Sequence, residues 1–198
     1  MKKLLLLLFA ISLSSLSFGQ SAKEMLAEIN GKWELDNNRN VTFVRVIEVP
    51  GVSKEDLYVR ALSYFTYTYV SGDDVVQVED KEAGTIIGKG VYPKVHIGVN
   101  LVATTVNTWH ILRVDVKDGR VRAIVTLTSY ENIITGGYGG PSVAKFAVSE
   151  RYPIVKKDPQ KTIMSKAFYK SYKAAMASLD GIERSLKEGN TGNDVGSW

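Results

Sequence analysis

Cysteine is absent from the 198 residues of this chain. Its absence excludes disulfide bonds, thiolate metal ligands, a cysteine nucleophile and lipid attachment to a cysteine. A domain without disulfides must be held together by core packing, and this chain is long enough to bury a core. Histidine is nearly as scarce. Only His96 and His110 are present, and their spacing gives no support to a metal site.

Long apolar runs are missing as well, apart from one at the start of the chain. A short basic segment precedes a ten-residue apolar run, Leu4 to Leu13, and small residues follow. This is the pattern of a secretory signal peptide, and the run is too short to cross a bilayer, which takes about 20 apolar residues. Ser17 and Gly19 are small enough to predict cleavage before Gln20. We therefore expect residues 1–19 to be a signal peptide, the mature chain to lack a transmembrane segment, and the protein to be periplasmic or extracellular.

No block of like charge occurs in the chain. There are 25 basic and 21 acidic residues, and loss of Lys2 and Lys3 with the leader leaves 23 against 21, a net charge of +2. A nearly neutral chain without a lysine- or arginine-rich run lacks the footprint of nucleic-acid binding or of polybasic membrane attachment. We therefore expect no nucleic acid among its partners.

After the leader, the sequence predicts an N-terminal segment over 20–40, a single α+β domain over 41–188 and a flexible tail over 189–198. Ser53 has the character of a helix N-cap and Gly189 that of a helix end. The segment 131–153 is expected to be a flexible loop with a short strand inside it, and 94–103 has no clear pattern. Apolar periodicity predicts helices at 54–69 and 160–187 and strands at 41–49, 75–79, 85–92 and 143–148.

The clearest local signal is Asp118-Gly119 between two alternating runs, which predicts a two-residue hairpin turn. Because side chains alternate along a strand, the pairing outward from this turn gives one apolar face and one wet face. The predicted pairs are Lys117–Arg120, Val116–Val121, Asp115–Arg122, Val114–Ala123, Leu112–Val125 and His110–Leu127. The element order then favours a mostly antiparallel sheet with two helices on one face.

Three strings resemble a known family: Val46 to Tyr58, Glu79 to Gly90, and Val116 to Arg120. The family is a group of uncharacterised exported domains from Bacteroidetes-type bacteria with a TATA-binding-protein-like fold. The resemblance covers about residues 41–130 and implies the order β-α-β-β-β-β-α. It implies no activity and no catalytic residue, and the name of the fold does not imply DNA binding, because fold does not fix function.

The sequence offers few candidates for catalysis. Gly84, Gly88 and Gly90 lie in a strand-like run rather than between a strand and a helix, so we expect them to permit close backbone approach rather than to bind phosphate. His110 is in phase with the apolar face, which predicts a half-buried, hydrogen-bonded histidine. Calcium-loop spacing and a G-x-S-x-G elbow are both missing. We assign no catalytic, cofactor-binding or metal-binding residue. An acidic cluster is expected to be a solvated edge: Asp73, Asp74, Glu79, Asp80 and Glu82.

A different group of residues combines aromatic, aliphatic and arginine side chains on the wet face of the hairpin. That combination is typical of the centre of a protein interface. The glycine-rich segment within 131–142 could carry a further aromatic residue to the same place. The candidate interaction surface consists of Trp109, Ile111, Arg113, Arg120, Arg122, Ile124, Tyr130 and Tyr138.

These observations favour a non-enzymatic exported domain that binds an envelope protein, peptide or glycan through its open sheet face. One alternative is a carboxylate-dependent hydrolase, which requires a pocket that joins Tyr138 to Glu79, Asp80 or Glu82. Another is a structural subunit of an envelope assembly, which requires an exposed apolar stripe on the C-terminal helix after that helix has packed on the sheet.

Overall fold

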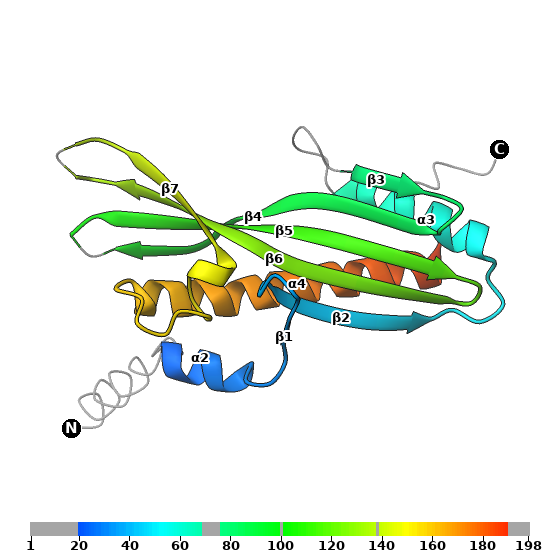
Figure 1. The fold of residues 1–198 in the computed structure, drawn as a ribbon, viewed down its shortest axis with the longest axis horizontal. Helices are drawn as coiled ribbons and strands as arrows, with labels where there is room; N and C mark the ends of the chain where they lie inside the picture. Colours follow the sequence, from blue (N-terminus) through cyan, green and yellow to red (C-terminus); the bar gives the residue numbers. More distant parts are fainter. Residues whose placement is uncertain (1–19, 69–75, 100, 138, 190–198) are drawn as a thin grey trace, which may run out of the picture.

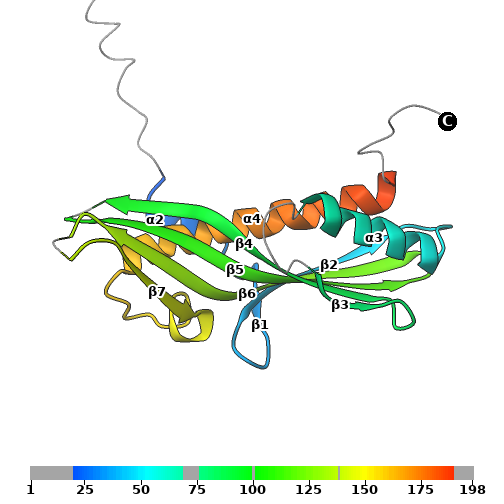
Figure 2. The ribbon, with the colours of Figure 1, turned by 90° about the horizontal axis from the view of Figure 1, so that it is seen from above.

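The computed structural model describes residues 20–68, 76–99, 101–137 and 139–189. In it, a long twisted antiparallel sheet carries a layer of helices on one face (Figures 1 and 2). The leader, residues 190–198 of the tail, Asp73, Asp74 and Tyr138 lie outside the described residues. Within those residues, no helix combines the length and the hydropathy needed to cross a membrane.

The sheet has seven strands in the order β1-β2-β6-β5-β4-β3, and β7 pairs with the second half of β6. Every neighbouring pair is antiparallel. Helices α3 and α4 cover one face, α2 packs against α4, and the turn that contains β1 stands on the other face (Figure 2). The strands are β1 (Glu34–Leu35), β2 (Val41–Glu48), β3 (Val76–Asp80), β4 (Thr85–Val99), β5 (Ala103–Lys117), β6 (Arg120–Thr135) and β7 (Ser142–Ala147). The helices are α2 (Ala22–Glu28), α3 (Lys54–Thr68), the 3-10 turn η1 (Val148–Glu150) and α4 (Lys161–Glu188).

The first two α-helices start at capping residues. Ser21 and Glu24 form a reciprocal capping box at α2. At α3, the hydroxyl of Ser53 accepts the backbone N–H of Asp56 at 3.1 Å, as the sequence predicted. Such a cap stabilises a helix by about 1 kcal/mol, because it satisfies a backbone donor that has no partner within the helix.

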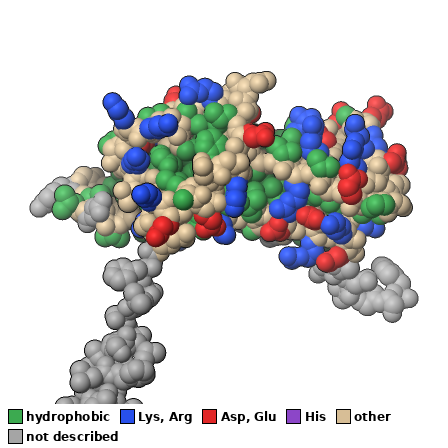
Figure 3. Space-filling view, turned by 90° about the horizontal axis from the view of Figure 1, so that it is seen from below, with side chains coloured by type: hydrophobic (Ala, Val, Ile, Leu, Met, Phe, Trp, Pro, Cys, Tyr) green, Lys and Arg blue, Asp and Glu red, His purple; other side chains and the backbone are tan. Residues whose placement is uncertain are grey.

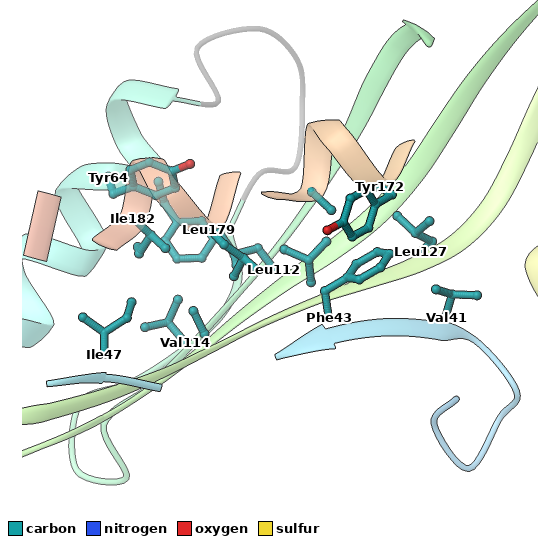
Figure 4. Packing of buried hydrophobic residues seen from close by; sticks show 14 of the residues in the cluster. Val41, Phe43, Ile47, Tyr64, Leu112, Val114, Leu127, Tyr172, Leu179 and Ile182 are labelled. Carbon is teal, nitrogen blue, oxygen red and sulfur yellow. The ribbon is translucent and has the colours of Figure 1, made fainter. Parts of the chain in front are cut away.

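The core lies between the sheet and α3 and α4 (Figure 4). Helix α4 has 28 residues and therefore runs about 42 Å along the sheet. Phe43 packs edge-to-face on Tyr172 with ring centroids 5.5 Å apart. Each large apolar side chain stabilises the fold by about 2 kcal/mol when it is fully buried. The apolar side chains that recur along α4 at helical spacing are buried throughout: Met164, Phe168, Ala175, Leu179, Ile182 and Leu186.

Charged side chains join the sheet edge to α4. The guanidinium of Arg45 on β2 bonds Asp180 at 2.6 Å and Glu183 at 2.9 Å, and Lys187 also reaches Glu183 at 2.6 Å. Figure 3 views the molecule from the side of β2 and shows basic and acidic side chains interleaved on its right half. These ion pairs are partly exposed, so each contributes at most about 1 kcal/mol.

The register predicted for the central hairpin is confirmed. All six pairs expected around Asp118-Gly119 occur in the structure, and Gly119 takes the left-handed conformation with φ 66°. The apolar members of these pairs face the helices and are buried.

Two sequence predictions about strand length are wrong. The strand that begins at Thr85 was predicted to end at Tyr92, before Pro93, but it continues to Val99. A bulge between Tyr92 and His96 accommodates the proline. There Lys94 takes φ 48°, and its N–H donates to the side-chain oxygen of Asn107 at 2.8 Å.

The expected flexible loop over 131–153 is also largely ordered. Strand β6 continues to Thr135, and β7 returns beside it from Ser142. The predicted strand at 143–148 is close to β7, and residues 136–141 make the connection.

Gly84 lies in the turn before β4 rather than in the strand. It has φ 71°, and a Cβ there would stand 2.6 Å from the carbonyl oxygen of Val116. Gly88 is buried on the helix-facing side of β4 and Gly90 is half-buried, and the close approach predicted at these two glycines stays a prediction. Gly51 supplies a matched comparison, since it has φ 80° but open space around its Cβ position.

Gly84→Ala should therefore lower the free energy of unfolding by about 3 kcal/mol, from left-handed strain plus a backbone clash. Gly51→Ala should cost about 1 kcal/mol, from the strain alone. Urea unfolding of both variants checks this. Equal losses would show that the close approach at Gly84 contributes nothing.

His110 is buried more deeply than expected, with no accessible surface, and its ring stacks on Tyr92 at 3.8 Å between centroids. Burial lowers the pKa of His110 to about 4. The native protein therefore keeps the imidazole neutral at pH values where the unfolded chain, with a pKa of about 6.5, takes up a proton.

The contribution of His110 to stability is present in full above about pH 6.5 and is lost as the pH falls towards 4. Between pH 7 and pH 5 we expect the wild type to lose about 1–2 kcal/mol more than His110→Phe, whose ring can still stack on Tyr92. Urea unfolding at both pH values measures the difference. Parallel losses in the two proteins would contradict it.

Candidate interaction surface on the open sheet face

Side chains on the sheet face away from the helices form rows across the strands, because neighbouring strands pair in a fixed register. Figure 1 looks onto this face. The row nearest the hairpin turn contains both acidic and basic residues. The third row from the turn is aliphatic except for one arginine. From the turn outward, the rows are Glu48–Arg120–Lys117, Val46–Arg122–Asp115–Thr85, Val44–Ile124–Arg113–Ile87 and Thr42–Thr126–Ile111–Lys89.

The third and fourth rows form the floor of a groove of about 490 Å³. Val44, Ile87, Ile111 and Ile124 supply aliphatic surface, and Glu34, Leu35 and Asp36 of the β1 turn line the groove as well. That turn is tied together by the Asp36 carboxylate, which accepts the backbone N–H groups of Asn38 and Asn40 at 2.9 and 2.7 Å. The groove thus combines an aliphatic floor with acidic residues at the β1 side and Arg113 within it.

The first two rows form a second hollow of about 300 Å³ beside the groove. Lys117, Arg120 and Arg122 line it together with Val46 and Asp115. The carboxylate of Asp115 accepts Arg113 Nε at 2.8 Å and Arg122 Nη2 at 2.7 Å. Partial burial works to raise the pKa of Asp115, but the hydrogen bonds from Arg122 and Arg113 outweigh it and hold that pKa below its usual value. The side chain is therefore ionised and fixes two guanidinium groups.

Trp109 lies beyond the fourth row and is half-buried. The ammonium groups of Lys145 and Lys89 lie 4.3 and 5.3 Å from its ring centroid, a cation–π arrangement. Its indole N–H is buried and has no acceptor among the described residues. Trp109 is therefore on the predicted face, but two lysines stand over its ring.

Tyr130 does not belong to the surface. Its side chain is fully buried, and burial raises its pKa. The reason is a bulge: Trp109 pairs with Ser129 but His110 pairs with Leu127, so Thr128 is an extra residue in β6. The extra residue reverses the alternation and turns Tyr130 towards the helices.

The structure therefore places six of the eight predicted surface residues on one face: Trp109, Ile111, Arg113, Arg120, Arg122 and Ile124. Sequence reasoning missed Val44 and Val46, which are 52% and 55% exposed, and the β1 turn beside them. The alternation within Val41–Glu48 could have identified the two valines, because it places them opposite Phe43 and Ile47. Nothing in the sequence indicated that the β1 turn would stand over this face.

The acidic residues of the hydrolase alternative lie elsewhere. Glu79, Asp80 and Glu82 are exposed around the β3–β4 turn, where Thr85 pairs with Asp115. The loop after Thr135 begins where that residue pairs with Ala103, at the other end of β5 (Figure 1). Twelve residues of strand separate the two places by about 40 Å. Among the described residues, no group of three His, Asp or Glu side chains is placed to hold a metal ion.

Residues 43–131 match the sequence model of a family described as "Domain of unknown function (DUF4468) with TBP-like fold". A DUF4468 family protein from Bacteroides ovatus has a similar structure, with a TM-score of 0.54 and 15% identity over 82% of this chain and 94% of that chain. A TBP-like protein from Parabacteroides distasonis gives a TM-score of 0.48 and 13% identity over 76% of this chain and 96% of that chain. No curated protein matches the chain. The resemblance and the α+β fold predicted from the sequence are confirmed.

Asp115→Asn should leave Arg113 and Arg122 without their shared acceptor and lower the free energy of unfolding by about 1 kcal/mol at neutral pH, the scale of a charged hydrogen bond near the surface. Because the folded pKa of Asp115 is lowered, the stabilisation is present above the unfolded value near 3.9 and is lost as the pH falls through the folded value. Urea unfolding at pH 6 and pH 2.5 should show a gap between wild type and variant that narrows in acid. A gap of constant size would contradict this role.

Proposed function

We propose that this chain, which carries a DUF4468 domain with a TBP-like fold over residues 43–131, is an exported module that holds a segment of an envelope protein on its open sheet face. The observation that carries the proposal is the asymmetry of the sheet. One face is covered by helices, and the other keeps a continuous aliphatic groove beside a cluster of arginines.

Single exposed apolar side chains are normal on a soluble protein, but here they are contiguous. Val44 and Val46 are more than half exposed, Val44 pairs with Ile124 on β6, and Ile111 lies one row further along on β5. A contiguous apolar patch with a charged border is characteristic of a protein interface. Burial of these side chains by a partner would therefore be favourable.

The chemistry of the groove supports a protein segment over a glycan. Sugar rings stack on open aromatic faces, but no described residue that lines the groove is aromatic, and the ammonium groups of Lys145 and Lys89 lie over the ring of Trp109 beyond the fourth row. The groove floor is aliphatic and suits the side chains of valine, leucine or isoleucine.

No specific observation supports either of the two alternative functions. The predicted acids and the glycine-rich loop of the hydrolase lie about 40 Å apart along the sheet. The apolar stripe of α4 is buried, and the exposed positions of that helix are mostly lysine, arginine or acidic residues. The location in the envelope is part of the proposal and rests on the leader at residues 1–19.

Val44→Glu should abolish capture of the partner, because it places a charge on the groove floor. Val59 is a matched control, since it is 53% exposed, lies on α3 on the other side of the sheet, and can receive the same substitution. Tagged wild type, Val44→Glu and Val59→Glu would be used to capture proteins from envelope extract, with thermal melts to show that all three are folded. A protein enriched by wild type and Val59→Glu but lost with Val44→Glu supports the proposal. Identical capture by all three would refute it.

A further inference from the structure

We propose that the hollow beside the groove is a carboxylate-binding subsite that reads an acidic side chain of the bound segment. The inference rests on the proposed function and adds a sequence requirement to it. The segment would carry an aspartate or glutamate two residues from an apolar residue, which lies in the groove.

The first support is uncompensated positive charge. Lys117 and Arg120 face each other across the hairpin, and like charges directly opposite destabilise a sheet. Among the described residues, neither side chain makes a hydrogen bond or an ion pair. Glu48 pairs with Arg120 in register, yet no ion pair forms between them. An incoming carboxylate would relieve the repulsion between the two cations.

The second support is the way in which Asp115 fixes Arg122. One oxygen of that carboxylate accepts both Nε and Nη2 of Arg122, at 3.1 and 2.7 Å. A guanidinium held in this way keeps Nη1 for a ligand and loses little side-chain entropy when it binds one. Asp115 therefore acts as a positioning residue for the subsite.

The third support is spacing. Val46 borders the hollow and Val44 borders the groove, and these residues lie two positions apart on β2. The two depressions are thus about 7 Å apart along the strand direction. Residues i and i+2 of an extended peptide point the same way at the same spacing, so one peptide strand can fill both depressions.

The lining also favours a carboxylate over a phosphate group. Asp115 contributes one negative charge to the hollow itself, so a dianion meets more repulsion there than a monoanion does. Lys117, Arg120 and Arg122 still outnumber that charge and keep the hollow net positive.

The test titrates isotope-labelled protein with three acetylated peptide amides and follows the backbone NMR signals of Lys117, Arg120 and Arg122. The probes are Leu-Ser-Glu, its neutral analogue Leu-Ser-Gln, and Leu-Glu-Ser, which has the wrong spacing. Inorganic phosphate is the fourth probe. We expect Leu-Ser-Glu to bind about tenfold more tightly than either other peptide, the value of one charged hydrogen bond. The double variant Lys117→Gln, Arg120→Gln should lose that preference, and Lys173→Gln, Arg184→Gln on the exposed side of α4 should retain it.

Equal affinity for the three peptides would overturn the subsite, as would tighter binding of phosphate than of Leu-Ser-Glu. A preference for Leu-Ser-Glu that persists in the double variant would do the same. The proposed function is judged separately by the Val44 capture experiment. If capture depends on Val44 but the protein shows no preference for Leu-Ser-Glu, the proposed binding of an envelope protein stands. Only the proposed requirement for an acidic residue in the bound segment is then refuted.

Discussion

Every strand of the sheet takes its place from the pairing of β5 with β6. These strands have 15 and 16 residues, and they pair along almost their whole length around a two-residue turn. Strands β2 and β7 then add to β6, and β4 adds to β5. A slip of one residue in this hairpin would turn the whole apolar set of both strands to solvent. The Asp118-Gly119 turn therefore determines which side chains meet the helices and which form the open face.

Strands in a sheet twist, whereas a helix is nearly straight. A hairpin of this length therefore cannot keep regular pairing along its whole length and still pack against a single helix. The two bulges, at Thr128 and near Pro93, allow the strands to change phase and direction beneath α4. At the first, Tyr130 turns inward to lie near Tyr152 and the 3-10 turn after β7. The open face consequently has two parts: a regular ladder near the hairpin turn, which carries the groove and the basic hollow, and a more irregular part beyond Trp109.

Much of this could be predicted from the sequence, because the signals were local. The Asp-Gly turn, the alternation around it and the serine N-cap at Ser53 gave the register, the buried face and the start of α3. The failures depended on distant contacts. A proline normally ends a strand, but Pro93 is accommodated because the side chain of Asn107 on the neighbouring strand accepts the N–H of Lys94. The inward turn of Tyr130 depends on one extra residue that no local pattern marks. The groove wall is formed by the β1 turn, and its position depends on how β2 docks against β6.

The bulge in β4 also interrupts the unpaired edge of the sheet. Beyond Gly88, the outer edge of β4 carries no partner strand among the described residues, and Ile97 and Val99 are largely exposed there. A long free edge of this kind is a template for strand addition and aggregation. Pro93 has no N–H to donate, and Lys94 next to it places a charge and a left-handed kink on the edge. The same irregularity that lets β4 follow the twist thus interrupts the row of backbone groups with which a further strand would have to pair.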